Sequence, residues 1–260
     1  METGATDTDI CSNPNGLLLR WDGREVQWAW VSRNPDSNES KFSFGSREVR
    51  KSSMLSEVVL ALKGRFSSVS EVVYAQRFAS TTMVPAIVLK DDSEAAVKWF
   101  KFHHAPTKDV GVRVLHLESI EEEPVFVEGL DQIWEESVMK IFPQARGIIQ
   151  SAALMETAIS LSRQIDLWVV VIDAGERGAD FSASYRGNAI WTGHSLKGDS
   201  ESILYSVVNA MHRNGVSQEG VAIRFSGLRG KDLNEAFKKF FSDVEYLGES
   251  KWEGLKLLLK

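Results

Sequence analysis

The sequence has a single cysteine and no long hydrophobic run, and both absences limit what the protein can be. Cys11 cannot form an internal disulfide, and it has no second cysteine with which to hold a structural metal ion. The longest unbroken apolar run, residues 167–172, is far too short to cross a bilayer. We therefore expect a chain without a transmembrane segment and without a disulfide framework.

The sequence also has fewer basic residues than acidic ones. The 30 lysines and arginines are outnumbered by 36 acidic residues, which gives a net charge of -6. Because a protein that neutralises phosphates needs a basic face, we expect no nucleic-acid partner. Glu2, Asp7 and Asp9 lie where a secretion signal would carry basic residues followed by an apolar stretch, so the N-terminus favours a cytoplasmic protein.

What the sequence does have is enough apolar content to fold, 43% over 260 residues, which can bury one large core or two moderate ones. Residues 1–15 are polar and rich in turn-forming residues, and we expect them to be a disordered leader. An apolar run at 17–21, an Asp-Gly pair and alternating apolar residues at 26–30 then predict a β-hairpin with a two-residue turn. The patterns that follow predict a strand around 42–44, a helix over 54–66 and a buried strand over 69–74.

The same order of elements recurs further along the chain. The strand pattern at 167–172 runs into Asp173 and Gly175, and Asp199 begins a capped helix. The remaining patterns predict strands over 180–185, 189–195 and 221–225, with the helix covering residues 200–211.

The two acidic-glycine turns lie 151 residues apart (173 minus 22), and this offset also relates the later strands. Adding 151 to positions 69 and 75 gives 220 and 226, which bracket the strand predicted over 221–225. We therefore predict two related α/β halves, 16–164 and 165–260. Between the repeats the sequence predicts helices over 92–102, 131–141 and 152–161, strands near 112–117 and 125–127 that form an inserted hairpin, and a strand at 145–149.

A sheet of three antiparallel strands followed by helix-linked parallel strands, present twice, resembles the ribonuclease H-like superfamily of actin, sugar kinases and chaperone ATPases. The chain is more specifically similar to a bacterial family of unknown function with this actin-like ATPase fold. More distantly it resembles the actin-like adaptors of pilus assembly and cell division. The resemblance runs from about residue 17 to 247 and is carried by the Asp-Gly hairpin, by residues 80–85 after a strand, by 141–143 before a strand and by the hairpin and helix of 169–211.

The resemblance implies a nucleotide site in active members, with ATP phosphates held by the backbone amides of two turns and Mg²⁺ placed through water by a carboxylate. In this chain Asp22 and Gly23 lack the residue that separates acid from glycine, so a plain hairpin turn is the favoured interpretation there. Asp173 and Gly175 keep the spacing, but Glu176 would repel phosphate. The candidate nucleotide-binding residues are Asp22, Gly23, Asp173, Gly175, Gly178, Gly227 and Gly230.

Other catalytic patterns are weaker. The stretch 193–200 has two glycines at phosphate-loop spacing, but Asp199 occupies the place of the lysine, which predicts a turn and a helix cap instead. No pair of histidines has helical metal spacing with an acid nearby, and no nucleophile elbow is present. The acidic run at 118–123 is a solvated loop or faces a basic partner, and residues 252–260 predict a helix docked on the body.

The leading hypothesis from the sequence is a non-catalytic or weakly nucleotide-binding scaffold or interaction module. Its partner would be an unknown protein or a second copy of the chain. The alternative is an ATP-dependent actin-like ATPase or kinase, in which Asp22, Asp173, Gly175 and Gly227 would have to converge on one cleft with Mg²⁺.

Overall fold

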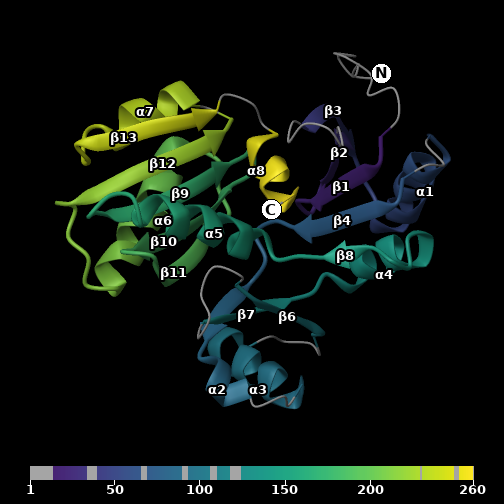
Figure 1. The fold of residues 1–260 in the computed structure, drawn as a ribbon, viewed down its shortest axis with the longest axis horizontal. Helices are drawn as coiled ribbons and strands as arrows, with labels where there is room; N and C mark the ends of the chain where they lie inside the picture. The colour runs from purple at the N-terminus through teal and green to yellow at the C-terminus, as the bar shows by residue number, and fades with distance from the viewer. Residues whose placement is uncertain are drawn as a thin grey trace. The chain divides into compact units, whose positions relative to one another are not determined.

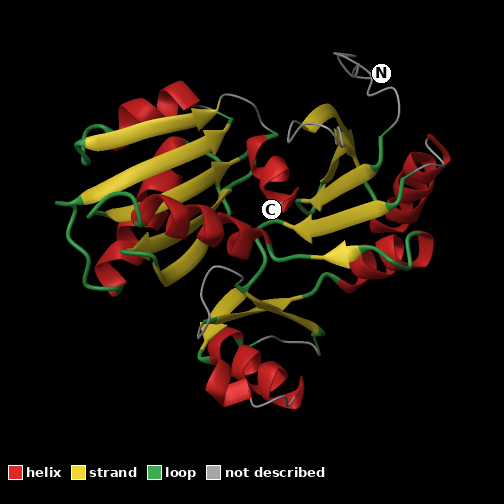
Figure 2. Cartoon of the chain, viewed as in Figure 1, coloured by secondary structure: helices red, strands yellow, loops and turns green. Residues whose placement is uncertain are grey.

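A computed structural model describes residues 14–33, 40–65, 69–89, 93–105, 110–117, 124–228, 230–248 and 252–259. In these ranges the chain forms two five-stranded sheets, one three-stranded sheet and the helices that cover them (Figures 1 and 2). Residues 1–13 of the expected leader and the acidic run 118–123 lie outside the described ranges.

The first five-stranded sheet has the order β3-β2-β1-β4-β8. β1, β2 and β3 are antiparallel neighbours, whereas β4 pairs in parallel with β1 and with β8. Its strands are β1 (Gly16–Trp21), β2 (Glu25–Arg33), β3 (Ser40–Glu48), β4 (Glu71–Gln76) and β8 (Arg146–Gly147).

The second five-stranded sheet has the order β11-β10-β9-β12-β13, with the same mixture of directions. β9, β10 and β11 are antiparallel neighbours, and β12 pairs in parallel with β9 and β13. Its strands are β9 (Trp168–Ala174), β10 (Ala179–Tyr185), β11 (Asn188–Ser195), β12 (Val221–Gly227) and β13 (Asp243–Gly248).

The two sheets are topologically equivalent strand by strand. In each, the first strand lies in the centre between its hairpin partner and the parallel strand that follows a helix. β4 and β12 also fall at the predicted offset, because Glu71–Gln76 shifted by 151 residues gives 222–227. The duplicated α/β pattern expected from the sequence is therefore present.

Helices cover both sheets with side chains at helical spacing. In the first sheet, η1 (Ser52–Met54), α1 (Leu55–Arg65) and α4 (Gln132–Ile141) bury Val58, Leu62 and Val138 against one face. In the second sheet α6 (Ser200–Arg213) and α7 (Gly230–Phe237) bury Val207 and Phe237 against one face, and α5 (Gln150–Ser162) covers β9 and β10 from the other. The chain ends in α8 (Glu253–Lys256) and η2 (Leu257–Leu259).

The segment predicted as an inserted hairpin is larger than expected. β6 (Val112–His116) and β7 (Val125–Gly129) form the predicted antiparallel pair, and β5 (Thr81–Val84) adds a third strand on the other side of β7. The helices α2 (Ala86–Leu89) and α3 (Ser93–His104) pack on this sheet. Phe126 of β7 packs on the side of α5 that carries Met155 and Ile159.

The chain divides into two compact units, which are not the two expected halves. Unit 1 takes in the described residues up to Arg77, then Asp131–Ile148 and the segment from Leu255 onward, whereas unit 2 takes in the insert and most of residues 149–254. The boundary of the repeat at 164/165 therefore stays a prediction. None of the helices in the described ranges is long and apolar enough to span a membrane.

Candidate functional site

A row of polar side chains crosses the second sheet near the end of β9. Asp180 of β10 and Ser226 of β12 both lie directly opposite Asp173 of β9, and His194 of β11 lies opposite Asp180. Residues in direct register point to the same face of a sheet. The side chain of Asp173 is completely buried, and those of Asp180 and Ser226 are each 4% exposed. Unit 2 thus brings the Asp173 turn beside the Ser226 loop, at the carboxyl ends of β9 and β12, where open α/β sheets bind their ligands.

The turn after Asp173, however, is closed by contacts with the protein itself. The amide of Gly175 donates a hydrogen bond to the carbonyl of Gly178 at 2.8 Å. A Cβ on Gly178 would collide with the carbonyl oxygen of Ser195, and a Cβ on Gly198 would collide with that of Glu176. These two glycines therefore allow the backbone after β11 to pack directly on the turn between β9 and β10.

The glycines of the Ser226 loop have a similar structural reason. Gly227 has a φ of +97°, and a Cβ there would collide with the carbonyl oxygen of Ala174. The next amide, that of Leu228, donates to the same Ala174 oxygen at 3.0 Å. A Cβ on Gly230 would collide with the ring of Tyr246, whose hydroxyl donates to the Gly227 carbonyl. The loop joins β12 to α7, so its glycines serve a strand-to-helix connection.

Asp22 and Gly23 belong to unit 1 and act there as turn residues. Oδ1 of Asp22 accepts hydrogen bonds from the amides of Arg24 at 2.9 Å and Glu25 at 2.6 Å, and Gly23 has a φ of +87°. Residues 22–24 connect β1 and β2, and the amide of Asp22 donates to the carbonyl of Glu25 at 3.3 Å, so the predicted hairpin and its tight turn are present. The remaining candidates, Asp173, Gly175, Gly178, Gly227 and Gly230, all belong to unit 2.

The sequence interpretation missed the polar side of β10. Ser182 donates to the carbonyl of Ser151 at 2.8 Å, and the hydroxyls of Ser184 and Ser162 are 2.8 Å apart, so β10 is joined to α5 by buried hydrogen bonds. Asp180 accepts a hydrogen bond from the amide of Phe78 at 2.9 Å. The alternation of Asp180, Ser182 and Ser184 with apolar residues was a visible signal, but it did not show that this polar face would be buried.

A histidine at the end of α3 lies close to this row. Nε2 of His104 is buried and has no hydrogen-bond partner within the described part of the chain. The pKa of His104 is lowered, first because partial burial disfavours the charged ring and then because His103 and His194 add like charge, while a hydrogen bond with the backbone of Thr81 opposes the shift.

This lowered pKa predicts a loss of stability in mild acid. A histidine whose folded pKa lies below its unfolded value contributes its full stability above the unfolded pKa, about 6.5, and loses it as the pH falls toward the folded value. We expect His104→Gln to weaken the fall in melting temperature that wild type shows below about pH 6.5. The exposed His116 of the same insert provides the control, and an equal change in His116→Gln would contradict the assignment.

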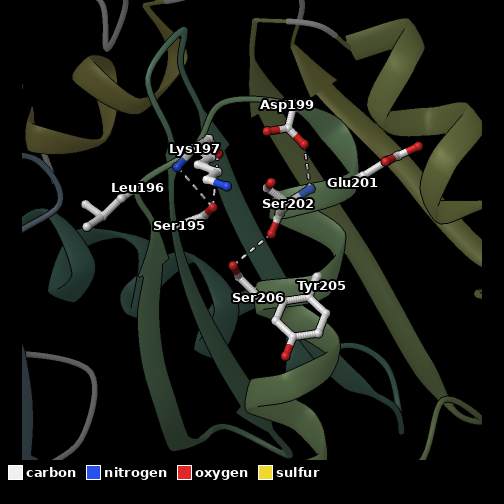
Figure 3. A pocket seen from close by; sticks show the side chains of 8 residues that line it. All are labelled: Ser195, Leu196, Lys197, Asp199, Glu201, Ser202, Tyr205 and Ser206. Carbon is white, nitrogen blue, oxygen red and sulfur yellow. Dashed lines mark hydrogen bonds between the residues drawn. The ribbon is translucent and has the colours of Figure 1, made fainter.

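A cavity of about 410 Å³ opens between the end of β11 and the first turns of α6 (Figure 3). Asp199 is the N-cap of α6 and accepts a hydrogen bond from the amide of Ser202 at 2.8 Å, which confirms the predicted turn and helix cap. The same hydrogen bond is the main cause of the lowered pKa of Asp199. The cavity is lined by Ser195, Leu196, Lys197, Asp199, Glu201, Ser202, Tyr205 and Ser206.

Within the described ranges, no three histidine, cysteine, aspartate or glutamate side chains lie where they could hold a metal ion together. Asp173 and Asp180 are an acidic pair, and any Mg²⁺ beside them would have to be bound largely by water or by phosphate oxygens.

No protein-family model matches this chain, and no curated protein sequence is significantly similar to it. Among solved structures, a Bacteroides thetaiotaomicron protein with an actin-like ATPase fold and unknown function aligns over 96% of this chain and 99% of its own, with a TM-score of 0.77 and 20% identity. This chain has the actin-like ATPase fold. The resemblance inferred from the sequence is thereby confirmed at the level of fold.

Two further solved structures align over nearly the whole chain. In the PilM-PilN type IV pilus biogenesis complex the match covers 92% of this chain and 89% of the other, with a TM-score of 0.55 and 16% identity. The cytoplasmic domain of EpsL, an inner-membrane component of the type II secretion system of Vibrio cholerae, matches over 94% and 92%, with a TM-score of 0.52 and 11% identity. At such identities the likeness establishes the fold alone.

Proposed function

We propose that this actin-like protein is an interaction module that does not hydrolyse nucleotide and binds it weakly or not at all. One observation carries the proposal. The space beside the glycines of the predicted phosphate turns is filled by other atoms of the same chain. Glycine in a phosphate-binding turn allows a ligand to approach the backbone. Here the missing side chains of Gly178 and Gly227 face the carbonyl oxygens of Ser195 and Ala174, and Gly230 faces the ring of Tyr246.

The amides and carboxylates of these turns support the same conclusion. The Gly175 amide is already hydrogen-bonded to Gly178, and Oδ1 of Asp22 accepts two amides of its own turn. Glu176, at the position of a phosphate-binding hydroxyl, is exposed and would oppose a phosphate by like charge. The residues present therefore fit ATP and Mg²⁺ poorly.

The partner is inferred to be a protein. PilM is seen in a complex with PilN, and EpsL is a component of a multiprotein secretion system, so both of these actin-like neighbours act within assemblies. An actin-like fold that retains its two sheets without a functional phosphate site is suited to the same kind of use. The partner of this chain would be another protein or a second copy of itself.

The alternative, an ATP-binding ATPase or kinase that uses the Asp22 and Asp173 turns, has one observation in its favour. Asp173 is completely buried at the end of β9 with Asp180 and Ser226 in register beside it, and buried acids at strand ends often serve function. In such an enzyme Asp173 would hold Mg²⁺ through water.

A thermal-shift titration with Mg-ATP separates the two functions. A ligand present at about 100 times its dissociation constant stabilises the folded state by about 2.7 kcal/mol, which should raise the melting temperature by several degrees. We expect a shift below about 1 °C at millimolar Mg-ATP, Mg-ADP or Mg-GTP. A rise of several degrees that disappears in Asp173→Asn would contradict the proposal and support the ATPase alternative.

A further inference from the structure

Two large hydrophobic side chains that line one cavity are mostly exposed to solvent. Leu196 is 71% exposed and Tyr205 is 72% exposed, and both line the cavity beside α6 (Figure 3). An isolated exposed apolar residue needs no explanation, but two that flank one hollow indicate a contact surface. We call this hollow, lined by the eight residues of Figure 3, the Leu196–Tyr205 groove.

The walls of the groove are held by hydrogen bonds to the backbone. Ser206 donates to the carbonyl of Ser202 at 2.8 Å, and Ser195 donates to that of Lys197 at 3.0 Å. The Asp199 cap fixes the start of α6, and Gly198 packs directly on the carbonyl of Glu176. A surface held in this way loses little conformational entropy when a partner binds.

The exposure of Leu196 and Tyr205 favours a segment of a larger partner over a small molecule. Small-molecule sites bury most of the ligand within enclosing walls. Leu196 and Tyr205 are both mostly exposed, so a small ligand seated in the hollow would leave much of each side chain in water. A protein segment with flanking residues would cover both.

The charges along the groove indicate which segment fits. Asp199 and Glu201 place two carboxylates at the α6 end, against the single ammonium group of Lys197. Asp199 stays ionised in mild acid because its amide hydrogen bond lowers its pKa. The exposed ring of Tyr205 can also receive a cation over its face.

We propose that the Leu196–Tyr205 groove binds a short segment of a partner protein that carries an apolar side chain next to a lysine or arginine. The apolar side chain would pack against Leu196 and Tyr205, and the cationic group would reach Glu201 and Asp199. This inference rests on the proposed function as an interaction module, and it adds a surface and a partner chemistry.

Phage display of random 12-residue peptides on the full chain tests the proposal, with counter-selection on the double variant Leu196→Ser/Tyr205→Ser. Both side chains are exposed, so we expect the variant to keep the wild-type melting temperature. Enriched peptides should carry an apolar residue beside a lysine or arginine. A synthesised copy of an enriched peptide should bind the Tyr205→Ser variant at least about tenfold more weakly than wild type, as is typical when a hot-spot aromatic residue is removed.

Two further variants define the controls. Glu201→Lys should weaken the same peptide several-fold, and the weakening should shrink as salt concentration rises. Leu60→Ser changes an exposed apolar residue on α1 of unit 1 and should leave the affinity unchanged.

The proposal is overturned if no peptide depends on Tyr205, or if the dependent peptides are acidic or lack an apolar residue. Its failure is distinct from failure of the proposed function, which the Mg-ATP titration decides.

Discussion

Replacing Gly227 with alanine is expected to lower the free energy of unfolding by about 3 kcal/mol or more. Two costs combine at this residue. A side chain at a φ of +97° is strained, by about 1–2 kcal/mol in the left-handed region. The new Cβ would also collide with the backbone oxygen of Ala174 on the neighbouring strand, and forcing extra atoms into packed structure costs about 1–3 kcal/mol.

Gly215 provides the matched control for this substitution. Its φ is +69°, but a Cβ there would have no atom within 4 Å. Gly215→Ala should therefore carry the conformational cost alone, about 1–2 kcal/mol. Urea unfolding followed by circular dichroism measures both variants. Equal losses in the two would mean that the backbone contact between Gly227 and Ala174 contributes nothing.

The same substitution bears on the proposed function. If Gly227 were reserved for a nucleotide, alanine would weaken ligand binding and leave the stability of the free protein near that of Gly215→Ala. A large loss of stability in the absence of any ligand is the result expected of a glycine that joins β12 to β9. The stability measurement thus tests the role of this loop without any assay of activity.

Trp134→Ala is expected to cost about 3–5 kcal/mol, the second large effect. The Trp134 side chain is 1% exposed, and its Nε1 donates to the carbonyl of Ala75 at 3.2 Å. Its ring lies 6.2 Å from that of Trp21 and 6.4 Å from that of Tyr74, which attaches α4 to the first sheet. Alanine would leave a cavity in this aromatic cluster and an acceptor without its donor.

Hydrogen exchange of the β1 and β4 amides is the appropriate measurement, because it reports the local stability of unit 1 even if the two units unfold separately. Ile133 precedes Trp134 on the same helix and is 49% exposed. Ile133→Ala should change the exchange free energies by less than about 1 kcal/mol. Similar losses of exchange free energy in the two variants would show that any change in α4 destabilises unit 1 and that the aromatic packing of Trp134 makes no special contribution.

Much of the fold could be predicted because it is encoded in local patterns. The alternation around Trp28 and Trp30 and the buried run before Asp173 indicated strands, and the spacing of Val207 and Met211 indicated a helix. β5 and β13 were missed. β5 is four residues long, and β13 alternates half-buried and exposed residues at a sheet edge, so neither carries a strong apolar pattern.

The candidate site was only partly predictable. The sequence indicated Asp173 at the end of a buried strand, and only the ATPase alternative required Asp173 and Gly227 to lie close together, as the parallel pairing of β9 and β12 places them. The sequence did not indicate that Asp180 would lie in register with Asp173. Nor did it show Leu196 and Tyr205 on one groove, because Leu196 lies in a turn and Tyr205 lies five residues into α6.

The sequence by itself determined the repeated order of strands and helices, the hairpins and the Asp199 cap, because these depend on residues within a few positions of one another. The tertiary structure alone decided what the glycines are for. Gly178 faces Ser195 and Gly227 faces Ala174, and such contacts join residues 17 and 53 positions apart (195 minus 178 and 227 minus 174). Whether a glycine leaves room for a ligand or for another backbone depends on which strand folds against it, and no local pattern records that.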